Sequence, residues 1–162
     1  QGNLRRSKTG GEAEYVGEPR PDGWIGRFLA PGGGTVEHFD RYLAPSIAQV
    51  EYRLEPNHVL ISNALTPISD FETMMYTIVS FRTRLPGPLV KLGLGPLAHW
   101  VLRQDKEMLA AQTEAIRQFE GERFVHTDVD VLGPHIWRLL KALERGQEPP
   151  ESEEVLQVDL RA

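Results

Sequence analysis

The 162-residue sequence is 25% charged and 40% hydrophobic, a composition typical of one ordinary globular domain that excludes a largely disordered chain. Its formal charge is -5 and its basic residues cluster only at Arg5, Arg6 and Lys8, so we expect no extended surface for nucleic acid. The absence of cysteine excludes disulfides, zinc–thiolate sites, a thiol nucleophile and a complete iron–sulfur cluster within these residues.

Hydropathy excludes a membrane span in the sequence. No window approaches the ~18 uninterrupted apolar residues that a spanning helix needs, and the N-terminal residues lack the apolar stretch of a signal peptide. We therefore expect a soluble protein, and the absence of cysteine fits the cytoplasm. Because the sequence does not begin with methionine, we expect residue 1 not to be the start of the natural gene product.

Residues 1–35 are predicted to be a turn-rich lead-in to the domain. Residues 1–12 are polar and contain glycine, which favours a mobile segment, and the "AEYVGEP" that follows could form a short strand. The triple glycine at residues 32–34 is predicted to be a turn and not a phosphate loop, because neither a lysine–serine pair nor a helix follows it.

Residues 36–83 alternate with a period of two, which is typical of strands. In "SIAQVEYRL" apolar residues such as Val50 and Leu54 alternate with Gln49, Glu51 and Arg53. This alternation indicates a strand with one buried face and one solvent-exposed face. "NHVLISNAL" and "FETMMYTIVSFRTR" follow after short turns, so the three strands are predicted to be antiparallel neighbours. The third strand is apolar on both faces, and we expect it to lie centrally in the sheet.

The next predicted element is a long helix. "LPGPLVKLGLGPLAH" contains three prolines and three glycines, which predicts an irregular apolar segment that either packs as a linker or covers a pocket. A helix is predicted from Leu97 to Phe119, where apolar residues recur at helical spacing, and Gly121 is a plausible end signal.

A second helix is predicted in "TDVDVLGPHIWRLLKALERG". Thr127 and Asp130 have the spacing of a capping box, and Gly146 would end the helix. Its buried stripe is predicted to be Ile136, Leu139, Leu140 and Leu143. Residues 147–162 are predicted to form a loose acidic tail.

Together these elements predict an α+β fold over residues 36–146. A curved antiparallel sheet followed by a long C-terminal helix is the helix-grip arrangement, as in START and Bet v 1-like domains, in which sheet and helix bury each other's apolar faces. Such a fold encloses a pocket readily, but the fold alone does not name an activity.

Asp105 interrupts the apolar stripe of the long helix. Trp100, Val101, Met108 and Leu109 recur on one side of "WVLRQDKEMLAAQTEAIRQF", and Asp105 falls on that side, which predicts a buried carboxylate. It could accept hydrogen bonds from loop amides or pair with an arginine. It could also bind a divalent cation, which would compensate its charge.

Other catalytic patterns are missing from the sequence. No two of its five histidines have the four- or five-residue separation common in metal pairs, and no serine lies in a G-x-S-x-G elbow. We therefore assign no catalytic residue from motifs.

A resemblance adds to this interpretation. "LRQDKEMLAAQTEAI", followed by "FVHTDVDVLGPHIWRLLKAL", resembles the C-terminal end of Rieske non-haem iron oxygenases, especially the branch of vanillate demethylase, dicamba monooxygenase and pheophorbide a oxygenase. "HVLISNALTPISDFETMMYTIVSF" also looks like the sheet of that family's catalytic domain. The resemblance extends over roughly residues 36 to 145 and is most specific in the helix.

The resemblance implies that Asp105 is the carboxylate ligand of a mononuclear Fe(II) held by two histidines and one carboxylate. It further implies an oxidoreductase of aromatic compound metabolism that hydroxylates or demethylates a hydrophobic or aromatic substrate. Electrons would arrive from a ferredoxin or flavin reductase through a Rieske [2Fe-2S] cluster, and the full-length oxygenase would be a homotrimer.

The sequence departs from that family's pattern in two respects. It contains no H-x-x-x-x-H motif and none of the cysteines of a Rieske domain. We therefore expect the histidine ligands and the cluster in an N-terminal part missing from these residues, and we expect this chain alone to be inactive.

An apolar substrate pocket is predicted to be lined by Met74, Tyr76, Ile78, Trp100 and Met108. The alternative function is a non-enzymatic helix-grip module that binds a hydrophobic small molecule, with Asp105 as a polar anchor.

Overall fold

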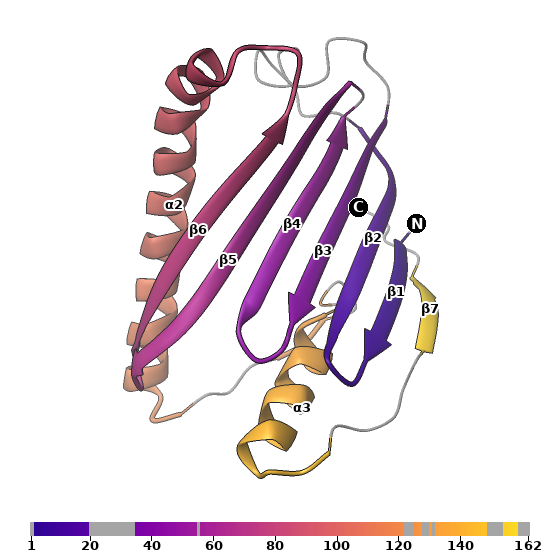
Figure 1. Cartoon of the computed structure of the whole chain (residues 1–162). Coiled ribbons are helices and arrows are strands. Elements are labelled where there is room, and N and C mark those ends of the chain that lie inside the picture. Colours follow the sequence, from indigo (N-terminus) through magenta and orange to yellow (C-terminus); the bar gives the residue numbers. More distant parts are fainter. Residues whose placement is uncertain are drawn as a thin grey trace. The chain divides into compact units, whose positions relative to one another are not determined.

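In the residues that the structure describes, the protein is an α+β chain with one antiparallel sheet and two helices, one of them long (Figure 1). This confirms the predicted fold class of a curved antiparallel sheet with a long helix. The chain divides into two compact units, Gln1–Arg82 with His126–Ala162, and Thr83–Val125. The computed structural model describes residues 2–19, 35–54, 56–121, 125–127, 130, 132–148 and 154–158.

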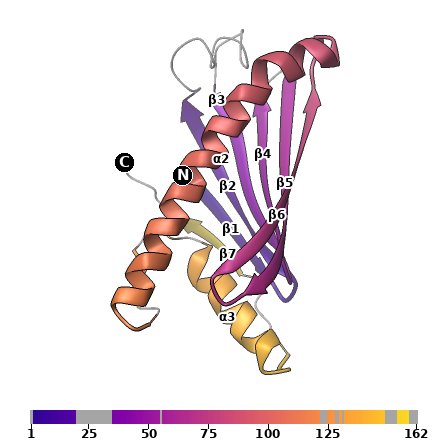
Figure 2. The same cartoon turned by 90° about the vertical axis from the view of Figure 1, so that its left-hand side faces the viewer.

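Seven strands form the sheet in the order β6-β5-β4-β3-β2-β1-β7, and every neighbouring pair in the described residues is antiparallel. The strands twist and curve along the sheet (Figure 1, Figure 2). Their bounds are β1 Gly2–Ser7, β2 Gly10–Pro19, β3 Thr35–Leu43, β4 Ile47–Leu54, β5 Asn57–Ser69, β6 Glu72–Arg82 and β7 Glu154–Val158.

The three strands predicted between residues 46 and 84 are confirmed as β4, β5 and β6, joined as antiparallel neighbours. The prediction that the third strand lies centrally is wrong, because β6 is an edge strand. Its apolar side chains are exposed on both faces, so apolar composition was no guide to its place in the sheet.

The predictions for both ends of the chain need correction. The lead-in segment contains β1 and β2, a hairpin that confirms the suggested strand in "AEYVGEP" but replaces the mobile segment predicted at residues 1–12. In the acidic tail, residues 154–158 form β7, which pairs with β1. The triple glycine lies in residues 20–34, outside the described residues.

Gly10 and Gly11 explain why a glycine-containing segment is ordered. A Cβ atom on Gly10 would lie 2.0 Å from the carbonyl oxygen of Tyr42, so glycine allows β2 to approach β3. A Cβ atom on Gly11 would lie 2.9 Å from Leu132 Cδ2 and 3.2 Å from His135 Cδ2. These glycines therefore permit close packing, whereas composition suggested mobility.

One face of the sheet, here called the core face, carries the hydrophobic core. Val36, Leu54 and Val59 are buried on neighbouring strands, which their register places on the same side. Half-buried Tyr52, Ile61 and Val79 pack against them. Burial of this apolar area is the main stabilising term of the sheet.

Helix α3 (Gly133–Glu144) packs against the β1–β2 hairpin (Figure 1, Figure 2). His135 is buried, and its Nε2 donates a hydrogen bond to the carbonyl oxygen of Gly10 at 2.9 Å. Of the predicted buried stripe, Leu139 is buried and Ile136 half-buried, whereas Leu140 and Leu143 are exposed.

The predicted capping box does not cap α3. Asp130 Oδ2 accepts hydrogen bonds from the backbone amide of Thr127 at 2.9 Å and from its hydroxyl at 3.3 Å. The pair therefore closes a turn before the helix, because α3 begins only after Leu132, whose side chain makes no capping bond.

Helix α2 (Gly87–Gln118) belongs to the Thr83–Val125 unit. It begins ten residues before the predicted Leu97, so most of the segment predicted to be irregular is helical. One proline lies in the first turn, where its missing amide is tolerated, and Pro96 is accommodated within the helix. Of the residues described, neither helix is long and apolar enough to cross a membrane.

Candidate functional site

Asp105 lies on α2 between two apolar neighbours of its helical face. Val101 precedes it by four residues and Met108 follows by three, the spacings that bring helical side chains together. All three side chains are exposed, and Met108 retains 66% of its accessible area. The prediction that Asp105 is buried is therefore wrong, because in the described part of α2 only Val90 is buried.

Among the described residues, no lysine, arginine or histidine forms an ion pair with Asp105. By contrast, Arg103 and Glu107, on either side of it, form a pair at 3.6 Å. The interpretation of Asp105 as half of an arginine pair therefore has no support in the described part of the chain.

A complete metal site requires more than this one carboxylate. In the part of the chain that the structure describes, no three His, Cys, Asp or Glu residues come close enough to hold a metal ion. Mononuclear iron of the two-histidine, one-carboxylate type needs three protein ligands. Asp105 can supply one of them, and the described residues do not supply the rest.

The residues predicted to contact a substrate fall into two groups. Met74, Tyr76 and Ile78 alternate along β6 and therefore project from one face of the sheet, with 45%, 61% and 64% of their area exposed. Their partners on β5 have smaller side chains, so these three stand out as an apolar strip. Trp100 and Met108 belong to α2, and both are exposed.

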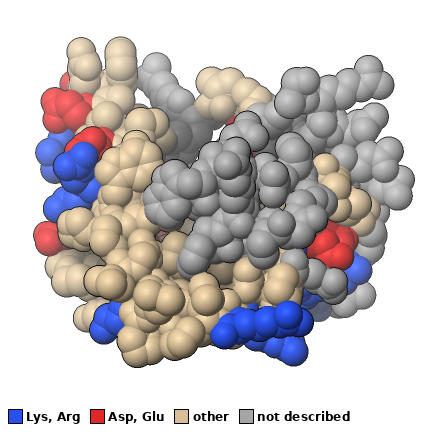
Figure 3. All heavy atoms as spheres, turned by 90° about the horizontal axis from the view of Figure 1, so that it is seen from above, with Lys and Arg blue, Asp and Glu red and all other residues tan. Residues whose placement is uncertain are grey.

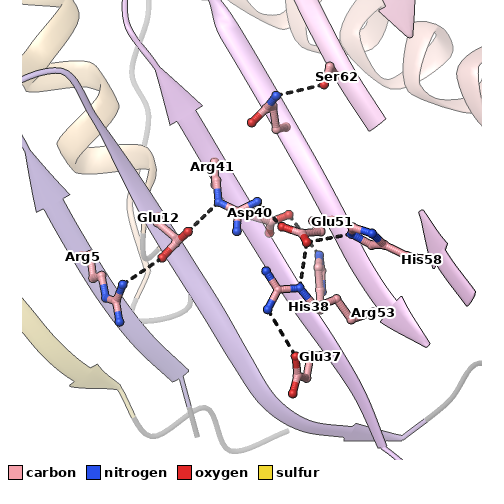
Figure 4. A network of polar contacts seen from close by, with 11 residues as sticks. Arg5, Glu12, Glu37, His38, Asp40, Arg41, Glu51, Arg53, His58 and Ser62 are labelled. Carbon is pink, nitrogen blue, oxygen red and sulfur yellow. Dashed lines mark hydrogen bonds and ion pairs between the residues drawn. The ribbon is translucent and has the colours of Figure 1, made fainter. Parts of the chain in front are cut away.

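An ionic network on the sheet face opposite the core face was missed at the sequence level (Figure 4). Glu51 on β4 is only 6% exposed and accepts hydrogen bonds from Arg53 Nε at 2.8 Å, from His58 Nε2 at 2.7 Å and from Arg41. Arg41 Nε also donates to Glu12 Oε2 at 2.5 Å. The prediction that the polar residues of β4 face solvent is therefore wrong at Glu51, because the side chains of Arg41, Arg53 and His58 cover its carboxylate.

The charges in this network stabilise each other. Burial alone would raise the pKa of Glu51, but the hydrogen bonds from Arg53, Arg41 and His58 outweigh it and lower that pKa to about 2. Burial acts to lower the pKa of Arg41, while its bonds to Glu12 and Glu51 raise it above the ordinary value. Glu51 is thus a fixed anion at neutral pH, which suits a structural clamp and not a proton shuttle.

His38 is a second polar group that the sequence did not single out. On the core face its ring stacks between those of Tyr15 and Tyr52, with centroids 4.9 and 4.5 Å away. Its Nε2 lies 3.0 Å from Oδ1 of Asp40. The alternation of β3 places His38 on the core face, beside the buried apolar residues.

Charge on the surface is mixed. On the face seen in Figure 3, acidic and basic side chains lie in small groups separated by uncharged surface. This face shows no extended basic patch among the described residues.

Comparison with known proteins identifies one family. A family model described as the vanillate O-demethylase oxygenase C-terminal domain matches residues 12–146. This range begins within β2 and ends after α3, so it includes Asp105 and the apolar strip of β6. No curated protein and no solved structure matched the sequence.

Proposed function

This chain belongs to the family of vanillate O-demethylase oxygenase C-terminal domains, and from that premise we propose that it forms the substrate-binding C-terminal part of a Rieske-type oxygenase. The reaction would be hydroxylation or oxidative demethylation of an aromatic substrate. The observation that supports this function is the family match over residues 12–146, which includes the long helix α2 that carries Asp105.

In this proposal, Asp105 is the carboxylate ligand of a mononuclear Fe(II). Its exposure and its lack of an ion-pair partner among the described residues support that role. A carboxylate with two histidines occupies one face of the iron and leaves the other open for dioxygen beside the substrate. The two histidines and the Rieske [2Fe-2S] cluster have to be supplied by polypeptide outside these 162 residues, which contain no H-x-x-x-x-H motif and no cysteine.

The substrate would be hydrophobic or aromatic. Met74, Tyr76 and Ile78 offer it an exposed apolar strip on β6. On α2, Met108 is an exposed apolar side chain one turn from Asp105, and Trp100 is the exposed aromatic residue nearest to it in sequence. Apolar contacts of this kind provide affinity, and a few polar groups then orient the ligand.

The remaining components follow from the same proposal. A ferredoxin or flavin reductase would deliver electrons to the cluster, and the complete oxygenase would assemble as a homotrimer in the cytoplasm. This chain alone would then be inactive, because it lacks two of the three iron ligands and the cluster.

The proposal is tested by metal analysis of the natural protein that contains this chain, purified anaerobically from its source. We expect acid-labile sulfide and about three irons per subunit, two in the cluster and one mononuclear. Asp105→Ala should remove the mononuclear iron and the oxygenase activity while the sulfide content stays unchanged. Glu107→Ala is the matched control, because Glu107 is another exposed carboxylate on α2 and should leave both intact.

Two results would reject the proposal. Retention of all iron and activity in Asp105→Ala would exclude the ligand role of this residue. A natural product without iron that binds aromatic compounds equally well in the presence of a chelator would instead support a non-enzymatic binding module.

A further inference from the structure

The first part of α2 is a much poorer helix former than the rest. The segment "GPLVKLGLGP", residues 87–96, contains three glycines and two prolines, whereas "LAHWVLRQDKEMLAAQTEAIRQ", residues 97–118, contains neither. Glycine loses more backbone freedom in a helix than any other residue, and proline in a helix interior removes a hydrogen bond. The two parts of α2, here called the entry segment (Gly87–Pro96) and the rod (Leu97–Gln118), therefore differ in intrinsic helical stability.

Pro96 interrupts the backbone hydrogen bonds of α2 where the two parts meet. It lies inside the helix, beyond the first turn in which proline is tolerated. Because proline has no amide hydrogen, Pro96 cannot donate to the carbonyl oxygen of Leu92, and its ring crowds that carbonyl. Sharp bends in helices occur mostly at such positions. The segment from Leu92 to Pro96 is therefore the weakest point of the backbone ladder.

Gly93 and Gly95 lie within this weak point, and no close packing contact requires them. A Cβ atom on either glycine would meet no described atom within 4 Å, whereas one on Gly10 would collide with a backbone oxygen. Alanine would therefore fit at both positions, and it is the better helix former. What glycine provides here is backbone freedom and not room for a neighbour.

We propose that Leu92–Pro96 is a hinge within α2, at which the rod changes its direction relative to the turns that precede it. Val90, the buried residue among those described in α2, lies on the entry side of the hinge. The rod carries Asp105, so bending at the hinge moves this carboxylate, and in the proposed oxygenase it would let Asp105 adjust its position to the iron. The hinge itself requires neither iron nor substrate, so its failure would leave the proposed function untouched.

The first test measures distances along α2 with pairs of spin labels, since the chain contains no cysteine that would compete for them. Lys91→Cys with Glu107→Cys places one label on each side of the hinge. His99→Cys with Ala115→Cys is the matched control, because both of its labels lie on the rod. All four residues are exposed, and each pair is sixteen residues apart, about 24 Å along a straight helix. Double electron–electron resonance on the 162-residue chain should give a broader distance distribution for the hinge pair.

The second test removes the hinge by combining Gly93→Ala, Gly95→Ala and Pro96→Ala. In this triple variant the distribution of the hinge pair should narrow to the width of the control pair, which should itself stay unchanged. Amide exchange of residues 87–96 should also slow by at least about fivefold, because each glycine-to-alanine change favours the helix by about that factor. Circular dichroism establishes that each labelled chain keeps its secondary structure.

Two outcomes would overturn the proposal. Equal widths for the two label pairs in the otherwise wild-type chain would show that α2 is as rigid at Leu92–Pro96 as within the rod. A hinge-pair distribution that stays broad in the triple variant would show that the motion does not come from Gly93, Gly95 and Pro96.

Discussion

Glu51 is held by side chains from its own strand and from the strands on either side of it: Arg53 on β4, Arg41 on β3 and His58 on β5. A buried carboxylate is tolerated only when its lost hydration is replaced in this way. Arg41 extends the network to Glu12 on β2 (Figure 4). The network therefore ties four strands together by side chains in addition to their backbone ladders.

Glu51→Gln should destabilise the protein by about 3 kcal/mol, the low end for breaking a buried ion pair, because Arg41 keeps its bond to Glu12. Urea unfolding followed by circular dichroism measures this change. The control is Glu37→Gln, which removes a 3.6 Å pair with Arg53 between largely exposed side chains and should cost less than about 1 kcal/mol. Equal effects of the two variants would contradict the structural role of Glu51.

The low pKa of Glu51 also predicts an acid-sensitive contribution to stability. Its pKa is about 2 in the folded chain against an ordinary 4.5, so the folded state favours the ionised form. This contribution is fully present above pH 4.5 and is lost as the pH falls toward 2. The difference in unfolding free energy between wild type and Glu51→Gln should therefore shrink across that range. A constant difference would show that ionisation of Glu51 is not involved.

At the scale of the elements, close backbone approaches decide where β2 and α3 lie. Gly10 lets β2 pair with β3, and its carbonyl oxygen receives the hydrogen bond from buried His135. Gly11 leaves room for Leu132 and His135 at the start of α3. The β1–β2 hairpin is thus the surface on which α3 packs.

Gly10→Ala should destabilise the chain by about 3 kcal/mol or more, because the new Cβ would lie 2.0 Å from a backbone oxygen that cannot move without separating β2 from β3. Thermal unfolding measures the loss. Gly133→Ala is the control, since the nearest atom to its Cβ is 3.9 Å away and the substitution lies at the start of α3. A small effect at Gly10 would show that β2 can shift at little cost.

For the whole molecule, the two compact units differ in how much of their surface is buried. The sheet unit contains the core of Val36, Leu54 and Val59, whereas in α2 Val90 is the one buried residue among those described. Helices in water take most of their stability from packing of an apolar face. Local stability should therefore be lower in α2 than in the central strands.

Amide hydrogen exchange of the 162-residue chain tests this difference. We expect the amides of α2 to exchange faster, relative to unstructured reference rates, than those of β3 and β4, because a helix with little burial opens without unfolding the sheet. Equal protection in α2 and β3 would contradict this expectation.

Local patterns in the sequence were sufficient for much of the fold. Alternation with a period of two predicted β4, β5 and β6, and helical spacing predicted the greater part of α2 and of α3. The short turns predicted antiparallel pairing. The residues around Asp105 carried the resemblance to the family to which the chain belongs. These features depend on residues close in sequence, which share one element and one set of backbone angles.

The strand order, the burial of Glu51 and the pairing of β7 with β1 were decided only by the tertiary structure. Each depends on residues far apart in the chain: Glu51 has its ordinary alternation within β4, and its burial comes from side chains of other strands. The placement of β6 at an edge likewise could not follow from its own apolar composition. Local periodicity determines which side of an element is apolar, whereas the partner that covers it is determined by contacts across the whole fold.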